Sequence, residues 1–254
     1  MTITVLGSGT SSGVPMIGCR CPVCTSGDPR DRRLRPSIAI EHGERRFVID
    51  TTPDFRYQAL RSKLPRVDAI LFTHSHADHI MGLDDVRPFN FHQGGRIPLY
   101  GSAETISTVR QVFHYIFDVQ ARTTFVPQLD THVHGGQPMN VFGLEFQPIR
   151  VMHGKLGIYG YRFGNVAYLT DHSAIPDESM EQLRGLDVLF LDALRHKPHP
   201  THSTVETSIE TVRKLGPRQA YLTHMSHDLP HEETEQFLPE GIHLAYDGLV
   251  IDAA

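Results

Sequence analysis

The sequence predicts a mixed α/β protein whose strands end in metal-binding side chains. Apolar runs and segments of helical periodicity follow each other in a strand–helix–strand order that occurs in both halves of the chain. Several of the apolar runs end at a His or an Asp. The chain also contains 17 His in 254 residues, which favours metal binding over a purely structural use of those strand ends.

In the first half, an apolar run at Ile3–Leu6 enters the glycine-rich segment Gly7–Pro15. That segment lacks the Lys of a P-loop, so we expect a turn whose glycines let backbones approach closely, with a phosphate contact left open. The arginines within Asp28–Arg35 are expected in a solvated loop, with anion steering as the alternative. The further strands predicted here are Ser37–Glu41, Arg46–Asp50, Asp68–Phe72 and Ile97–Gly101, with helices over Phe55–Leu64 and residues 102–116 and a short helix near Asp84–Pro88.

In the second half, residues 123–147 are predicted to form strands and turns, including a strand over Val141–Phe146. A hairpin is expected where Tyr159–Phe163 and Val166–Leu169 flank Gly164-Asn165. Apolar runs then lead to metal-capable residues, and these are His153, Asp171, Asp192 and His224. A single strand-end His is more often structural, but the shared arrangement reverses that preference.

The strongest motif is the segment from Thr73 to His79, which places three His and one Asp within six residues directly after an apolar run. His74 and His76 alternate in an extended segment and can reach one ion, whereas Asp78 and His79 can face a second ion. Imidazole suits Zn, Mn or Fe, and a carboxylate extends the choice toward harder cations. A His-rich surface loop without function does not account for the spacing H-x-H-x-D-H.

All three cysteines lie in Cys19-Arg20-Cys21-Pro22-Val23-Cys24. An odd number of cysteines in so short a segment is a poor disulfide framework. Three thiolates in one loop match the spacing of zinc ligands, and a tetrahedral site needs a fourth ligand from elsewhere. Three unligated thiols are the alternative.

Composition limits the classes of function. The hydrophobic share of 39% and the charged share of 21% are ordinary for a soluble globular protein. No linker or low-complexity stretch divides the chain, so we expect one domain over residues 1–254. A net charge of −5 argues against a protein that grips long nucleic acid by its backbone. The first residues lack the features of a signal peptide, and no apolar run approaches the ~20 residues of a membrane helix, so we expect a cytoplasmic protein.

His74-Ser75-His76-Ala77-Asp78-His79 resembles the signature of the metallo-β-lactamase superfamily of dinuclear hydrolases. The resemblance implies a four-layer αββα sandwich. It also implies one ion on His74, His76 and His153, a second ion on Asp78, His79 and His224, and Asp171 as the bridge. Strands that end in Asp commonly support the His cluster in this superfamily, so Asp50 is a hypothetical partner of one ligand, although Thr51 replaces the usual Gly.

A finer resemblance, over nearly the whole chain, is to the branch with tRNase Z and the PhnP-like phosphodiesterases. It rests on Gly7–Pro15, Gly18–Cys24, Thr73–His79, Thr223–His227 and Tyr246-Asp247-Gly248. It implies a structural zinc on Cys19, Cys21, Cys24 and His227. It further implies catalytic roles for Asp78 and for His202 as general acid, with a surface or supporting His as the alternative for His202. Arg87 either holds a phosphate or pairs with Asp84 or Asp85.

By this resemblance we expect a phosphodiesterase with two Mn²⁺ or Zn²⁺ ions and one structural Zn²⁺. The expected substrates are small cyclic phosphodiesters such as phosphoribosyl 1,2-cyclic phosphate or 2′,3′-cyclic nucleotides. A lactonase or thioesterase of the same fold is the alternative. RNA 3′-end processing and a non-catalytic interaction protein are less favoured by the sequence than either of these. The expected partners are the small substrate and a second copy of the chain in a homodimer, with no membrane and no long nucleic acid.

Overall fold

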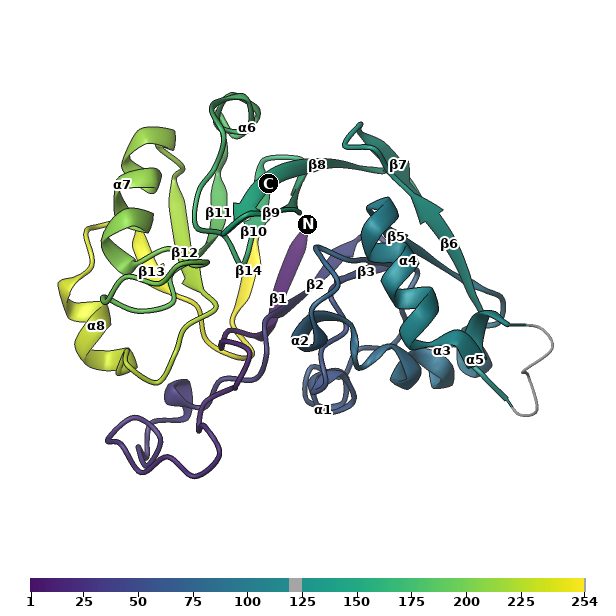
Figure 1. Cartoon of the computed structure of the whole chain (residues 1–254), viewed down its shortest axis with the longest axis horizontal. Coiled ribbons are helices and arrows are strands. Elements are labelled where there is room, and N and C mark those ends of the chain that lie inside the picture. Colours follow the sequence, from purple (N-terminus) through teal and green to yellow (C-terminus); the bar gives the residue numbers. More distant parts are fainter. Residues whose placement is uncertain (119–124, 254) are drawn as a thin grey trace.

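Two seven-stranded sheets face each other in the computed structural model, which describes residues 1–118 and 125–253 (Figure 1). The first sheet combines the N-terminal half with the last strand of the chain. Its strands, in spatial order, are β14 (Val250–Asp252), β1 (Thr2–Gly7), β2 (Ser37–His42), β3 (Arg45–Ile49), β4 (Ala69–Leu71), β5 (Ile97–Gly101) and β6 (Leu129–Val133).

The second sheet belongs to the C-terminal half. Its strands, in spatial order, are β13 (Ile242–Leu244), β12 (Gln219–Thr223), β11 (Val188–Asp192), β10 (Val166–Leu169), β9 (Leu156–Phe163), β8 (Leu144–His153) and β7 (Met139–Val141). Strands β10 to β13 pair in parallel, whereas β7 to β10 form antiparallel pairs. Because β10, β11 and β12 are parallel, the residues that follow them meet at one edge of the sheet.

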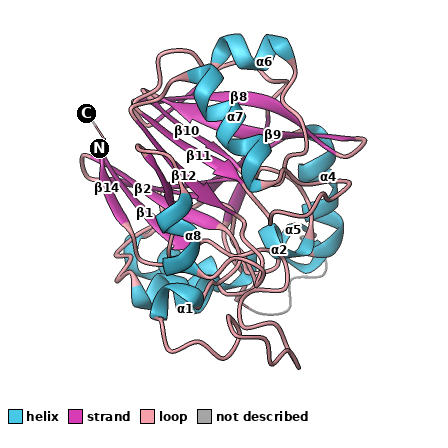
Figure 2. Cartoon of the chain, turned by 90° about the vertical axis from the view of Figure 1, so that its left-hand side faces the viewer, coloured by secondary structure: helices cyan, strands magenta, loops and turns pink. Residues whose placement is uncertain are grey.

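Helices cover the outer face of each sheet, so the layers follow the order α, β, β, α (Figures 1 and 2). The first sheet carries α1 (Phe55–Arg61), α2 (Ala77–Ile80), the 3₁₀ helix η2 (Leu83–Val86), α3 (Arg87–Gln93), α4 (Ala103–Val112) and α5 (His114–Phe117). The second sheet carries α6 (Asp177–Gln182), α7 (Val205–Leu215) and α8 (His231–Phe237). A further 3₁₀ turn, η1 (Pro29–Asp31), lies in the long loop between β1 and β2. The predicted αββα sandwich is confirmed.

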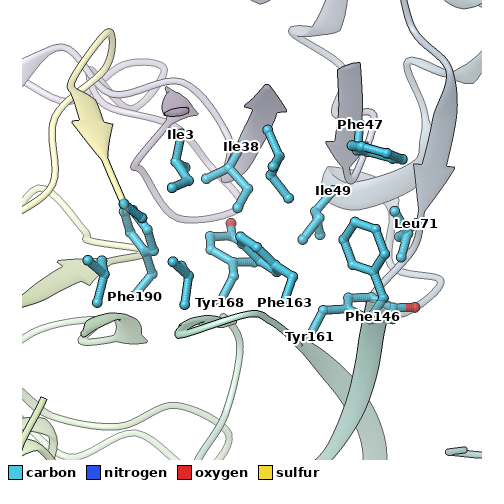
Figure 3. Packing of buried hydrophobic residues seen from close by; sticks show 14 of the residues in the cluster. Ile3, Ile38, Phe47, Ile49, Leu71, Phe146, Tyr161, Phe163, Tyr168 and Phe190 are labelled. Atoms are coloured by element: carbon cyan, nitrogen blue, oxygen red, sulfur yellow. The ribbon is translucent and has the colours of Figure 1, made fainter. Parts of the chain in front are cut away.

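The core between the sheets is built from the inward-facing residues of both. Phe47 on β3 packs against Phe146 on β8 with ring centroids 5.3 Å apart, and Phe146 also contacts Phe163 on β9 (Figure 3). Strands that bury one face on the other sheet and one face under helices read as nearly continuous apolar runs, as β11 does with all five residues buried.

Three predicted elements differ from the structure. The strand predicted over Val141–Phe146 is wrong, because Phe142 (φ +50°) and Gly143 (φ +88°) form the turn between β7 and β8. The helix predicted over residues 102–116 breaks at Phe113 into α4 and α5. The helix that starts at Phe55 stops at Arg61, three residues earlier than predicted.

Other predicted elements are confirmed. The hairpin at Gly164-Asn165 joins β9 and β10, and Ile97–Gly101 is β5. The part of the predicted 123–147 segment at residues 123–124 lies outside the described residues. Within the described ranges, no helix is both long enough and apolar enough to cross a membrane.

Candidate metal centre

A cluster of metal-capable side chains lies where the ends of strands from both sheets meet. The motif after β4 contributes its residues from the turn and from α2. His153 is the last residue of β8, and Asp171 and His224 follow β10 and β12. The structure brings together all seven predicted ligands of the dinuclear site, which are His74, His76, Asp78, His79, His153, Asp171 and His224.

These side chains form two groups. One group consists of His74, His76 and His153, and the other of Asp78, His79, Asp171 and His224, with the ligand atoms of each group within 4.8 Å of one another. His76 is exposed while the other six are buried, so the cluster opens to solvent on the His76 side.

Asp171 lies between the two groups. Its Oδ2 is 3.1 Å from Nε2 of His224 and 3.9 Å from Nε2 of His74, and its Oδ1 is 3.3 Å from Nε2 of His79. Nitrogen and oxygen atoms that share an ion at about 2.1 Å in a tetrahedral arrangement are roughly 3.4 Å apart. The spacing therefore fits a carboxylate that bridges two ions.

Several of these polar atoms are buried and have no hydrogen-bond partner. They are Nε2 of His74, Nε2 of His79, Nε2 of His224 and Oδ2 of Asp78. Orphaned buried polar atoms are rare in folded proteins and need an explanation. All four point to the same cluster, and a bound divalent cation is the partner that satisfies them together.

The charges of the cluster support the same conclusion. Burial lowers the pKa of His224, but Asp171 and Asp78 outweigh burial and raise it to about 10. Burial raises the pKa of Asp171, but the neighbouring His224 and His79 side chains outweigh burial and lower that pKa well below its usual range. Without an ion, the carboxylates hold protons on His79 and His224, and a divalent cation would replace those protons.

A buried carboxylate behind the cluster orients one imidazole of each group. Asp50 Oδ2 accepts a hydrogen bond from His79 Nδ1 at 2.8 Å and another from the Thr73 hydroxyl at 2.8 Å. Because that hydroxyl donates to Asp50, it accepts from His74 Nδ1 at 3.1 Å. Asp50 thus lies where the sequence hypothesis placed it, and it leaves Nε2 of both His79 and His74 free for an ion.

A second pair of contacts orients residues on the other side. Nδ1 of His153 lies 2.8 Å from the Thr201 carbonyl, which can only accept, so Nε2 of His153 remains free. Nδ1 of His202 lies 2.8 Å from Asp192 Oδ2, and the His202 ring is 4.7 Å from that of His153. The His202 side chain is only 10% exposed and lies against the cluster, so it is not a surface His.

The backbone is strained at three of these positions. Asp50, Asp171 and His224 have φ of +65°, +57° and +59°, in the left-handed region that residues other than Gly rarely adopt. Such strain persists where surrounding contacts hold it, and it concentrates at functional sites.

The cysteine cluster meets His227 from the loop after His224. Nδ1 of His227 is 3.3 Å from Sγ of both Cys19 and Cys21, and the four ligand atoms, with Cys24, lie within 4.8 Å of one another. A tetrahedral zinc with these ligands separates sulfur and nitrogen by roughly 3.5 Å. The backbone N–H of Cys24 and the His227 side chain lower the pKa of Cys21 to about 6, which favours the thiolate needed for metal binding.

The same two loops are also joined by an arginine that the sequence placed in solvent. The prediction of a solvated loop is wrong for Arg33, which is 1% exposed. Its guanidinium donates to the backbone carbonyls of Ser226 and Leu229 at 2.9 and 2.6 Å and contacts Asp31. Its charge is tolerated in the interior because these acceptors satisfy it.

Glycines bring the N-terminal loop close, as predicted. A Cβ on Gly7 would lie 2.0 Å from the Arg35 carbonyl oxygen, and Gly9 pairs with Met225, the residue after His224.

The contacts of Arg87 match one of its two predicted alternatives, whereas the partner of Asp192 was not predicted. Arg87 lies 3.8 Å from Asp84 and donates to the Phe125 carbonyl, so the ion-pair alternative describes its contacts. For Asp192 the sequence predicts only a metal-capable residue at a strand end, whereas the structure pairs it with His202. A carboxylate at the end of β11, ten residues before a candidate acid, was the signal available.

Comparisons with known proteins agree with this geometry. The family profile described as "Beta-lactamase superfamily domain" matches residues 45–225. The crystal structure of a new diphosphatase from the PhnP family is 55% identical in sequence, with a TM-score of 0.94 and coverage of 100% of this chain and 98% of that one. Zn²⁺-bound PqqB from Methylobacterium extorquens shares the fold, with a TM-score of 0.80, 22% identity and full coverage of both chains.

A longer relative extends beyond the matched region. The octanoyltransferase of Porphyromonas gingivalis is 40% identical over 252 residues, which is 98% of this chain but 51% of that protein. The chain thus spans about half the length of the curated relatives it matches.

Proposed function

Since the chain belongs to the β-lactamase superfamily, we propose that this metal-dependent hydrolase is a phosphodiesterase that cleaves small cyclic phosphodiesters. The observation that carries the proposal is the pair of metal-capable groups that meet at Asp171, with buried nitrogen and oxygen atoms that lack hydrogen-bond partners. Full-length similarity to a PhnP-family diphosphatase supports a phosphoryl substrate over a lactone or a thioester.

We propose that two divalent ions bind to the two predicted sets of ligands. Two cations about 3.5–4 Å apart would lower the pKa of a water between them and offset charge on phosphoryl oxygens. Mn²⁺ and Zn²⁺ both suit imidazole and carboxylate ligands. Asp78 has a lowered pKa, because His79 and His224 outweigh the effect of burial, and this keeps its carboxylate ionised as a ligand.

His202 is proposed as the general acid. Its Nδ1 donates to Asp192, so Nε2 is the nitrogen available to give a proton to the leaving oxygen. The Asp192 carboxylate is fixed in turn by the His172 backbone N–H at 2.8 Å. Asp192 therefore sets the tautomer and the direction of the acid.

Cys19, Cys21, Cys24 and His227 are proposed to hold a structural Zn²⁺ that ties the N-terminal loop to the loop bearing His224. The three thiols are free, and a zinc-thiolate site of this kind suits the reducing cytoplasm, which we propose as the location. We also propose that residues 1–254 act as one domain, supported by a core cluster with residues from both sheets. The homodimer remains a proposal, which light scattering after size-exclusion chromatography tests.

The test is hydrolysis by protein loaded with Mn²⁺ or with Zn²⁺. The substrates are a ribose 1,2-cyclic phosphate, a 2′,3′-cyclic nucleotide, a nucleoside diphosphate derivative, a lactone and a thioester. Preference for the cyclic phosphates is expected. Turnover of the diphosphate alone would favour a second candidate, phosphoanhydride hydrolysis, which the 55% identity to a diphosphatase supports. Turnover of only the lactone or thioester would refute both.

A further inference from the structure

We infer that Gly154 is a positioning residue that lets the segment bearing His202 dock onto the ion ligand His153. The inference rests on the proposed function, because it takes His153 as a ligand and His202 as the acid. Gly154 directly follows His153 at the end of β8 and adopts φ +62°. Its backbone N–H donates to the Ser173 hydroxyl, which anchors the turn.

A side chain at this position would collide with the docked segment. A Cβ on Gly154 would lie 2.9 Å from Cγ2 of Thr201 and 3.5 Å from the carbonyl oxygen of Pro200. Carbon atoms in contact are normally about 3.5–4.0 Å apart. The turn after His153 and the segment before His202 therefore approach closely only because residue 154 is Gly.

The close approach joins the two halves of the centre. The Thr201 carbonyl is the acceptor that fixes His153 Nδ1, at 2.8 Å, and thereby turns Nε2 toward the ion. The next residue is His202, whose ring packs on the His153 ring. On the far side, the Ser203 backbone N–H donates to the His172 carbonyl at 2.7 Å, beside the bridging Asp171.

Thr201 cannot turn aside without cost. Its β-branched side chain has few staggered positions, and its hydroxyl lies 3.1 Å from His199 Nδ1. Rotating the side chain away from a new methyl group would lose this contact. Moving the backbone instead would shift the Thr201 carbonyl and His202 together. One added methyl group should therefore disturb an ion ligand and the acid at once.

The experiment compares Gly154→Ala with Gly164→Ala. Gly164 has a similar φ, +57°, but a Cβ there would meet nothing within 4 Å, so this variant reports the backbone strain alone. The first readout is the affinity for the two ions, measured by chelator competition. The second is the ratio of turnover for an alkyl diester to that for a nitrophenyl diester.

Gly154→Ala should lower the affinity for one of the two ions by about 10- to 100-fold, as loss of the hydrogen-bond partner of a ligand does. It should also lower the alkyl-to-nitrophenyl ratio, because a nitrophenolate leaves without a proton donor. Gly164→Ala should leave both readouts at the wild-type values. Adding Thr201→Ser to Gly154→Ala removes Cγ2 but keeps the carbonyl and the hydroxyl, and should restore both.

Equal behaviour of Gly154→Ala and Gly164→Ala would overturn the inference, and so would a failure of Thr201→Ser to rescue. Failure of the proposed function is recognised separately. If the wild type does not bind two ions, or if His153→Ala retains both, the ligand assignment is wrong and the inference falls with it. If both controls behave as proposed, a wild-type result for Gly154→Ala refutes the positioning role alone.

Discussion

Replacing Asp50 by Asn should lower the affinity of the proposed dinuclear centre for both ions. Asp50 accepts three hydrogen bonds, from the Thr73 backbone N–H, the Thr73 hydroxyl and His79 Nδ1. An amide has one oxygen, so at least one donor must face its NH₂ group. If that donor is His79, the amide would donate to Nδ1 and leave the proton on Nε2, the atom that must bind the ion.

The magnitude follows from the contacts. A hydrogen bond to a charged group contributes about 1.5–3 kcal/mol, and loss of an outer partner of a ligand typically costs about 10- to 100-fold in metal affinity. We expect losses in this range for the ion on His79 and smaller losses for the ion on His74. Asn suits the substitution because it tolerates the φ of +65° at this position.

Thr73→Val is the matched comparison. It removes the hydroxyl that links Asp50 to His74 but leaves the contact between Asp50 and His79. Only the affinity for the ion on His74 should therefore fall. The assay is competition with a chromogenic chelator, together with thermal unfolding of the metal-free variants as a check on folding. Wild-type affinity for both ions in folded Asp50→Asn would refute the reasoning.

Three other outcomes test separate parts of the structure. His202→Ala should slow alkyl diesters far more than nitrophenyl diesters, and Asp192→Asn should show the same trend more weakly; equal losses on both substrates would argue against an acid. Burial lowers the pKa of His134 to about 4 from 6.5, so its neutral form stabilises the fold fully above pH 6.5 and this contribution is lost as pH falls toward 4. The loss is at most about 3 kcal/mol. His134→Phe should therefore show a shallower fall in unfolding free energy between pH 6.5 and 4, and parallel curves would contradict this. Cys21→Ser should remove one zinc per chain and reduce turnover, because the loop bearing His224 loses one of its ties to the N-terminal loop; unchanged zinc content would refute the structural site.

The fold class and the candidate ligands could be predicted from local patterns in the sequence and from the superfamily resemblance that those patterns carry. The spacing from His74 to His79 lies within one short segment, and the apolar runs mark the strands that end at His153, Asp171 and His224. Parallel pairing of β10, β11 and β12 brings the ends at Asp171 and His224 together. The end of β8 at His153 joins them because two antiparallel pairings, through β9, give β8 the same direction as β10. The Phe142-Gly143 turn is a local feature, in which the Asn140 side chain accepts a hydrogen bond from the Gly143 backbone N–H at 3.1 Å. The helical periodicity of residues 102–116 does not mark the break at Phe113.

Only the tertiary structure decided which groups support those ligands. The contact between His153 and the Thr201 carbonyl joins residues 48 positions apart, and backbone carbonyls carry no sequence signal. The burial of Arg33 depends on carbonyls of residues 226 and 229, almost 200 positions away. The absence of a side chain at Gly154 gains meaning only when Thr201 is seen against it. Side-chain type and spacing predict which groups can bind an ion. The folded chain determines which acceptor orients each imidazole ring and which backbone segments come into contact.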